Sequence, residues 1–303
     1  MDPDLVRRLL PDLQRLQTRV ALISGGEPLL NPAWRDIAQL LHGAGLKLWL
    51  LTSGLSLAKH AQRVAALFEA VTVSLDGTDH ATYEAIRGLD AFEKVCEGIR
   101  ATAAAGSQVS VRVTLQRANY RQLPRFVELS RALGAQQVSF LAVDVANPHA
   151  FARRDEFSAD LALQREDLPV LSTILDRLEE EHAPAFRSGL IADSPRKLRR
   201  IHQYFSAVCG LGDYPRPRCN VFEYSAVIGA TGRVSPCFFI SGPRAPAAHE
   251  DLEEILNHPS MSSLREHIRT GRRPECTRCV CSLWRDPGNR GVADFLPAGR
   301  AHA

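Results

Sequence analysis

Cysteine is absent from the first 95 residues, although the whole chain of 303 residues contains seven. Cys96 stands alone, and the other six cysteines all fall in the last third of the sequence. A cysteine-held metal or a disulfide is therefore excluded from residues 1–95. In a reducing compartment, a cluster of cysteines such as the one in the last third is more often a metal site than a disulfide framework.

Strong charge of one sign and long apolar runs are also lacking. The chain has 37 basic and 34 acidic residues, and its formal net charge is +3. This balance gives no indication of a nucleic-acid or membrane surface. The sequence contains no run of about 18 apolar residues, so it predicts no transmembrane helix. The N-terminus also lacks the apolar core of a signal peptide. We expect a cytoplasmic protein with neither nucleic acid nor membrane as a partner.

The first half of the chain alternates short apolar runs with helical patterns. The apolar runs are rich in β-type residues, which is typical of strands buried on both faces. Between them, apolar residues recur at the three- and four-residue spacing of helices. Repeated βα units predict a parallel sheet or barrel of the α/β class. The expected strands are residues 19–24, 46–52, 70–75, 108–115 and 136–143.

The turns that follow the first three of these strands are small, polar and glycine-containing. They are Gly25–Pro28, Thr52–Gly54 and Ser74–Gly77. In parallel α/β folds, ligands bind at the carboxyl ends of the strands, and glycine lets a ligand approach the backbone. These turns are therefore the predicted ligand-binding region.

The order of these three turns within one βα series resembles the radical S-adenosylmethionine (SAM) enzymes. The resemblance covers about residues 1–145, and the GGEP sequence taken alone is also compatible with a simple tight turn. It implies that Gly25, Gly26 and Glu27 bind the amino group of SAM and that Pro28 stiffens the turn. Backbone carbonyls and one carboxylate suit an ammonium group.

The resemblance implies weaker roles for three further residues. Ser53, Ser74 and Asp76 are candidates for contacts with the ribose or the carboxylate of SAM. For Asp76, a hairpin-like or helix N-cap role is an equal alternative.

The family's cluster-binding motif does not occur in this sequence. Radical SAM enzymes hold the SAM-cleaving [4Fe–4S] cluster with three cysteines spaced C-x3-C-x2-C, upstream of the GGEP strand. Here Met1 precedes what would be the first helix. The resemblance therefore implies a partial (β/α)6 barrel without its first strand. We expect an N-terminal truncation, and a degenerate protein unable to cleave SAM is the alternative.

The last third contains a predicted β-hairpin and two groups of cysteines. Residues 223–228 and 233–240 are β-type around a glycine-containing turn, and residues 251–268 have a helical pattern. Cys219 precedes the hairpin, Cys237 lies near its far end, and Cys276–Cys281 follow the helix in an expected loop. Four thiolates suit either an iron–sulfur cluster or tetrahedral zinc, and the spacing alone does not decide between them.

The spacing C-x12-G-x4-C, followed by LEEILN and a C-x2-C pair, resembles the SPASM and twitch domains of radical SAM enzymes. The shorter twitch pattern implies one auxiliary [4Fe–4S] cluster with the ligands Cys219, Cys237, Cys276 and Cys279. Cys209 and Cys281 are spare thiols, and either could replace one ligand. A structural zinc site is the alternative, because C-x2-C pairs serve both metals.

These observations divide the chain into four parts. We expect a βα core over residues 1–145, a helical connector over 146–205, a small hairpin-and-helix cluster domain over 206–290 and a tail over 291–303. Cys96 is interpreted as a small buried hydrophobe on a core helix.

The resemblance implies an enzyme that uses SAM and iron–sulfur clusters to abstract hydrogen through a 5′-deoxyadenosyl radical. The implied substrate is a peptide or a small metabolite, and the implied electron donor is a flavodoxin or ferredoxin. Two alternatives remain at this point: a degenerate accessory module that binds SAM or a partner, and a zinc-stabilised α/β protein without enzymatic activity.

Overall fold

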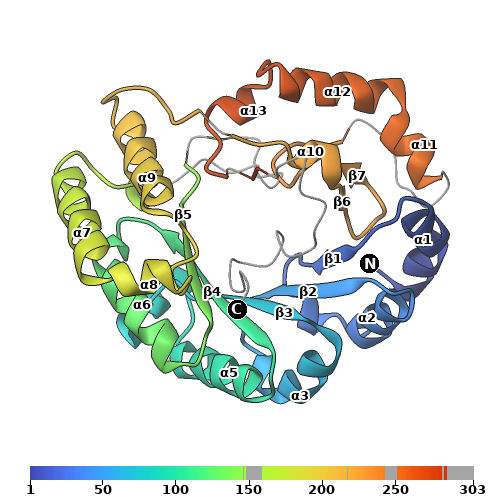
Figure 1. The fold of residues 1–303 in the computed structure, drawn as a ribbon, viewed down its shortest axis with the longest axis horizontal. Coiled ribbons are helices and arrows are strands. Elements are labelled where there is room, and N and C mark those ends of the chain that lie inside the picture. The colour runs from blue at the N-terminus through green and yellow to red at the C-terminus, as the bar shows by residue number, and fades with distance from the viewer. Residues whose placement is uncertain (146, 148–158, 217, 243–250, 282, 285–303) are drawn as a thin grey trace.

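The computed structural model describes residues 1–145, 147, 159–216, 218–242, 251–281 and 283–284. Its centre is a curved sheet of five parallel strands in the order β1-β2-β3-β4-β5, which confirms the predicted α/β class (Figure 1). Each strand falls within one of the apolar runs identified in the sequence. The strands are β1 (Val20–Ile23), β2 (Lys47–Thr52), β3 (Ala70–Ser74), β4 (Gln108–Leu115) and β5 (Gln137–Ala142).

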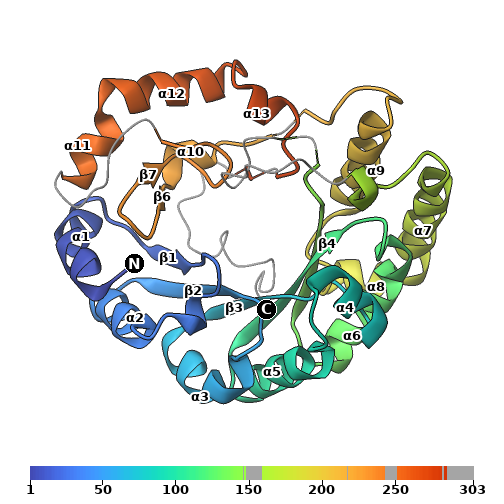
Figure 2. The ribbon, with the colours of Figure 1, turned by 180° about the vertical axis from the view of Figure 1, so that it is seen from behind.

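Helices line the outer side of the curved sheet, as both ribbon views show (Figures 1 and 2). The first helix begins as its sequence predicts, because the Asp2 carboxylate accepts a hydrogen bond from Leu5 N at 2.7 Å and Pro3 occupies the first turn. The helices of this part are α1 (Pro3–Arg15), α2 (Trp34–Gly43), α3 (Leu57–Leu67), α4 (His80–Arg87), α5 (Phe92–Ala104), α6 (Leu123–Ala132), α7 (Asp167–Glu181), α8 (Ala183–Arg187) and α9 (Pro195–Val208).

The two faces of the sheet differ, contrary to the expectation that both would be buried. Val71, Val73, Val111 and Val113 are fully buried, and they belong to the main hydrophobic core. The alternate positions are more accessible, and Arg112 in the middle of β4 is exposed. Helices cover the outside of the curved sheet, and polar side chains are tolerated at the more accessible alternate positions.

Beyond β5, a single bridge from the connector extends the sheet. Val138 N donates to Leu190 O at 2.7 Å and Ala192 N donates to Val138 O at 2.9 Å, which is a parallel pairing with Ile191. The amphipathic helix predicted for this part is confirmed by α7, whose Leu168, Leu171, Leu175 and Leu178 are buried. The connector therefore packs as part of the barrel rather than as a separate layer.

The C-terminal part contains the predicted hairpin, but its elements are shorter than expected. Residues 223–224 are helical rather than β-type, and the expected helix 251–268 is two helices divided at His258, because Pro259 begins the second one. Cys276 lies in a short helix rather than a loop. The elements are α10 (Val221–Tyr224), β6 (Val227–Ile228), β7 (Val234–Ser235), α11 (Leu252–Asn257), α12 (Pro259–Arg269) and α13 (Pro274–Thr277).

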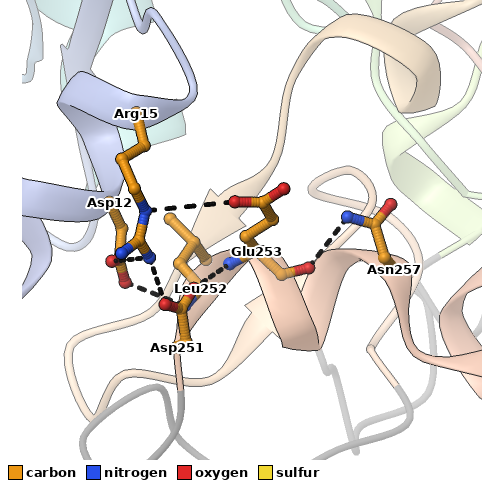
Figure 3. Close-up of polar contacts among 6 residues, drawn as sticks. All are labelled: Asp12, Arg15, Asp251, Leu252, Glu253 and Asn257. Carbon is orange, nitrogen blue, oxygen red and sulfur yellow. Dashed lines mark hydrogen bonds and ion pairs between the residues drawn. The ribbon is translucent and has the colours of Figure 1, made fainter.

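Helix α1 joins this C-terminal part to the barrel. A second, small apolar cluster combines α1 with the hairpin and with α11 and α12 through Leu5, Leu9, Val234, Leu252, Ile255 and Met261. Polar contacts flank it (Figure 3): Asp12 Oδ2 accepts a hydrogen bond from Leu252 N at 2.8 Å, and Arg15 pairs with both Asp12 and Asp251. The first turn of α11 is thus fixed directly onto α1.

The predicted boundaries are only partly covered by the structure. Helix α9 continues to Val208, past the expected end of the connector at residue 205. The expected tail, 291–303, lies outside the described residues, as do residues 146 and 148–158 of the connector. The four-part division of the chain stays a prediction. No helix in the described ranges is long and apolar enough to cross a membrane.

Candidate cofactor and metal site

The turn after β1 presents bare backbone. Gly25 and Gly26 are exposed, and a Cβ added at either position would meet no other atom within 4 Å. Gly25 has φ +138°, a conformation that side-chain-bearing residues rarely adopt. A ligand can therefore reach the carbonyl and amide groups of both residues.

The Glu27 carboxylate connects this turn to the turn after β2. Its Oε1 accepts hydrogen bonds from Thr52 Oγ1 at 2.7 Å and Leu29 N at 3.1 Å. Its Oε2 accepts from Ser53 N at 2.7 Å and from Ser53 Oγ at 2.5 Å. Pro28 is buried and begins a 3₁₀ helix (Pro28–Leu30) that Glu27 caps. The predicted residues Gly25, Gly26, Glu27, Pro28 and Ser53 are thus brought together in one rigid turn pair.

Ser74 belongs to a polar row across three neighbouring strands. It lies at the end of β3 in register with Arg112 of β4, which is in register with Ser139 of β5. Arg112 Nε donates to Ser139 Oγ at 3.4 Å. Within the described ranges, no carboxylate forms an ion pair with Arg112. The guanidinium therefore has donors left for an anionic ligand.

Arg112 was missed in the sequence. A charged residue in the middle of an otherwise apolar strand was the available signal, but strand runs of this kind were interpreted as buried on both faces. The significance of Arg112 depends on its register with Ser74 and Ser139, which residue spacing does not provide.

Asp76 is buried and already has partners in the protein. It is 4% exposed, its carboxylate accepts a hydrogen bond from Thr114 N at 2.7 Å, and it pairs with Arg87 at 2.6 Å. Burial raises the pKa of Asp76, while the positive charge of Arg87 opposes that shift. The N-cap of α4 is Asp79, which accepts from Thr82 N at 2.9 Å, so the alternative N-cap role does not apply to Asp76.

Five cysteines near the C-terminus influence one another electrostatically. Burial raises the pKa of Cys276 to about 11, and negative charge on Cys237 and Cys219 raises it further. Burial likewise raises the pKa of Cys281 to about 11, again with contributions from Cys219 and Cys237. The pKa of Cys279 is raised by burial and by charge on Cys281, Cys276 and Cys237. We call Cys219, Cys237, Cys276, Cys279 and Cys281 the cysteine group.

The cysteine group suits a metal site that uses several thiolate ligands. Buried thiols that repel each other as thiolates need a cation to deprotonate together, and a metal supplies that charge. Among the described residues, no three Cys, His, Asp or Glu side chains are arranged to hold a single metal ion. A [4Fe–4S] cluster distributes its four thiolates over different iron atoms, so its ligands are spread more widely.

The two remaining cysteines lie elsewhere. Cys209 donates from Sγ to Leu163 O at 3.3 Å, and its pKa, raised by burial, is influenced by Arg165 and Glu166 rather than by other thiols. Cys96 is 1% exposed on α5, which confirms its interpretation as a small buried hydrophobe. Of the two spare thiols considered in the sequence, Cys281 therefore joins the cysteine group and Cys209 does not.

Two family models match the chain. The radical SAM superfamily model matches residues 1–129, and the SPASM model, an iron–sulfur cluster-binding domain, matches residues 219–280. The second match includes Cys219, Cys237, Cys276 and Cys279 but ends one residue before Cys281. These domains imply SAM and a [4Fe–4S] cluster as cofactors.

Curated relatives and solved structures agree with these domains. The chain is 29% identical over 234 residues to a GTP 3′,8-cyclase of Erythrobacter litoralis, covering 74% of this chain and 65% of the cyclase. It is 26% identical to the Fe-coproporphyrin III synthase of Methanosarcina barkeri, covering 98% of this chain and 70% of the synthase. The chain spans less than two thirds of several such relatives, for example 39% of an AdoMet-dependent heme synthase from Methanosarcina barkeri.

The fold is similar to that of Streptococcus suis SuiB in its crystal structure with the precursor peptide SuiA. The TM-score is 0.64 at 12% sequence identity, and the match covers 93% of this chain and 65% of SuiB. At this identity, the likeness concerns the fold alone.

Proposed function

The chain belongs to the radical SAM superfamily and carries a SPASM-type iron–sulfur domain. We therefore propose that it is an enzyme, or part of an enzyme, that acts on a peptide or a small metabolite. The cofactors of this superfamily are SAM and a [4Fe–4S] cluster, which would together supply a 5′-deoxyadenosyl radical for hydrogen abstraction. The observation that carries the proposal is Glu27, an anchored carboxylate beside two glycines whose backbone is open to a ligand.

The proposed SAM site binds both charged groups on the α-carbon of the methionine moiety. The Gly25 and Gly26 carbonyls and the Glu27 carboxylate accept hydrogen bonds from the ammonium group. Ser74 and Arg112 donate to the carboxylate, with the guanidinium providing charge-assisted hydrogen bonds. Ser53, fixed by Glu27, and Asp76, fixed by Arg87, lie at the turns where the ribose would be bound.

In the proposed metal site, Cys219, Cys237, Cys276 and Cys279 hold one auxiliary [4Fe–4S] cluster. When bound, this cluster accepts or relays single electrons. The four residues are half-buried, so they exclude much water from the cluster without closing it off. Cys281 is the alternative ligand because it belongs to the same group.

The ligands for a SAM-cleaving cluster do not come from the start of this chain. Residues 1–95 contain no cysteine, and Cys96 is buried within the main core. No step that depends on such a cluster is therefore assigned to residues of this chain. The residues named above bind and orient SAM and hold the auxiliary cluster.

The experiment is anaerobic reconstitution with iron and sulfide, followed by metal analysis and titration with SAM. The proposal expects about four irons per chain from one cubane cluster, saturable SAM binding, and loss of that binding in the Glu27→Gln variant. Zinc in place of iron would support a structural zinc site. Protein that binds neither iron nor SAM would overturn the proposal.

The names of the relatives bear on the substrate class. SuiB was crystallised with a precursor peptide, whereas the curated relatives include a cyclase and a porphyrin-related synthase by name. We propose a peptide or small-metabolite substrate, a flavodoxin or ferredoxin as electron donor and a cytoplasmic location. Calorimetric titration of the reconstituted protein with candidate precursor peptides and small metabolites, in the presence of SAM, tests the substrate class by binding.

A further inference from the structure

Strand β3 separates from β4 at the turn that follows it. Ser74, the last residue of β3, is in register with Arg112, and Leu75 N donates to Arg112 O at 3.0 Å. In a continued parallel ladder the next donor, Thr114 N, would bond to Leu75 O. It bonds instead to the carboxylate of Asp76 at 2.7 Å. The two strands therefore diverge at the carboxyl end of the sheet, which is where ligands bind in folds of this kind.

A buried amide bridges the diverging strand ends. Asn119 is fully buried, and its Nδ2 donates to Asp76 O at 2.9 Å and to Thr114 O at 3.0 Å. Its Oδ1 accepts from Gln116 N at 2.9 Å. Both polar atoms of this side chain are therefore used, and a satisfied buried network fixes the groups that it joins.

A second amide holds the far side of the same turn. Gln122 Oε1 accepts from Thr78 N at 3.1 Å. Its Nε2 donates to Asp79 Oδ2 at 2.8 Å and to Thr82 Oγ1 at 2.7 Å. Both amides belong to the segment that follows β4, so this one segment holds the turn after β3 on two sides.

Asp76 contributes to the shape of the turn through both of its carboxylate oxygens. Oδ1 accepts the hydrogen bond from β4, and Oδ2 pairs with Arg87 at 2.6 Å. The carboxylate is thus engaged within the protein, and its effect on a ligand is exerted through the turn. We call residues 74–78 the β3 turn, and Asn119 and Gln122 the amide clamp.

We propose that the amide clamp positions the ribose of SAM. The inference rests on the proposed SAM site, in which the β3 turn lies beside the ribose. The clamp acts through the turn: it fixes the β3 turn relative to β4, so that the main chain of the turn meets the nucleoside while the glutamate turn holds the ammonium group. Asn119 and Gln122 are therefore positioning residues. Their loss should weaken binding of the nucleoside and spare binding of the amino-acid half.

The test compares SAM with S-methylmethionine, which keeps the sulfonium, the ammonium and the carboxylate but lacks the nucleoside. SAM is titrated into reconstituted protein by calorimetry, and S-methylmethionine binding is measured by saturation-transfer NMR. Asn119→Ala should weaken SAM binding by about tenfold, because it leaves two buried carbonyls without their donor. Gln122→Ala should weaken it by about threefold, because that side chain is only half-buried. Both variants should bind S-methylmethionine as the wild type does.

Tyr120→Phe is the matched control in the same segment. Tyr120 lies between the two amides, but its hydroxyl donates to Asp167 Oδ1 of α7 at 2.7 Å, away from the β3 turn. Loss of this hydroxyl should lower the Tm and leave the SAM affinity unchanged. The control therefore separates a loosened segment from a lost clamp.

Unchanged SAM affinity in both clamp variants would overturn the inference. So would an equal loss of affinity for SAM and S-methylmethionine, because a general loosening of the barrel weakens both ligands. If Asn119→Ala does not fold, Gln122→Ala decides by the same comparison. Wild-type protein that does not bind SAM would instead overturn the proposed function, and the inference with it.

Discussion

The glutamate turn and the cysteine group are built in opposite ways. Glu27 lies between the ends of β1 and β2, where two strands of a continuous sheet determine its position, and it accepts four hydrogen bonds. In the cysteine group, Cys276 lies in a four-residue helix, and the other four thiols lie outside the helices and strands. A carboxylate in the first region is fixed by the fold, whereas the thiols of the second are only brought into one neighbourhood.

Because the two regions differ in this way, SAM and a metal cluster are expected to contribute differently to folding. Stacked βα units bury enough apolar surface to hold a turn rigid without help. The small cluster around Leu252 and Ile255 buries far less, and much of its support comes from α1. On the proposed function, a metal cluster would contribute to folding in the second region, and SAM would occupy a site already formed in the first.

The largest effect is expected from removing a cluster ligand. Cys279→Ala should lower the iron content from about four per chain to nearly none, because a cubane cluster needs its thiolate ligands. Limited proteolysis should then cut the C-terminal part while the barrel resists. Cys209→Ala is the matched control and should keep its iron, because that thiol lies apart from the cysteine group. Full iron in both variants would contradict the ligand assignment.

A smaller but specific effect is expected at the glutamate turn. Glu27→Gln should weaken SAM binding by about tenfold or more, since hydrogen bonds to charged groups contribute about 1.5–3 kcal/mol. Isothermal titration calorimetry measures the change. Glu69→Gln removes an exposed carboxylate that pairs with Lys47, and it should bind SAM as the wild type does. An unaltered affinity in Glu27→Gln would show that the turn does not hold the ammonium group.

The junction between the two regions should respond next. Asp12→Ala leaves the buried Leu252 N without its acceptor, which costs about 1–3 kcal/mol. Hydrogen exchange should accelerate in α11 and α12 while β2 and β3 stay protected. Asp4→Ala on the same helix removes only an exposed pair with Arg7, so its exchange pattern should match that of the wild type. Equal protection of α11 in both variants would mean that Asp12 does not position the C-terminal part.

The smallest effect concerns the pH dependence of stability through Asp76. Burial raises its folded-state pKa above the ordinary value of 3.8, so the folded protein binds more protons than the unfolded chain in the window above that value. Its contribution to stability is present below that window and is lost as the pH rises through the folded-state pKa. The Tm advantage of wild type over Asp76→Asn should therefore shrink as the pH rises from about 4. A constant Tm difference across this range would contradict the raised pKa.

Much of the barrel could be predicted because its signals are local. Apolar runs located all five strands, and Asp2 with Pro3 located the start of α1. The junction of α11 and α12 was missed although Pro259 signalled it, because the apolar spacing continues across the break. The start of α5 was not identified: the helix begins at Phe92, and the nearby Asp90 contacts His80 at 2.8 Å.

The site was less predictable because its contacts join distant residues. Sequence spacing identified Glu27 but not its bonds to Thr52 and Ser53, which depend on the pairing of β1 with β2. Sequence spacing could not distinguish Cys209 from Cys281 either, because only the folded structure shows which of the two lies with the C-x2-C pair. Arg112 was missed for the same reason, because the fold, and not residue spacing, shows that only one face of β4 is buried.

Helix α1 has a consequence for biosynthesis. Leu5 and Leu9 find their partners in residues 234–261, and the hydrogen bond from Leu252 to Asp12 spans 240 residues. A nascent chain therefore leaves the ribosome with an apolar helix face that stays uncovered until residues 234–261 have been synthesised. During that interval this face is a natural target for chaperones and a point of entry for aggregation.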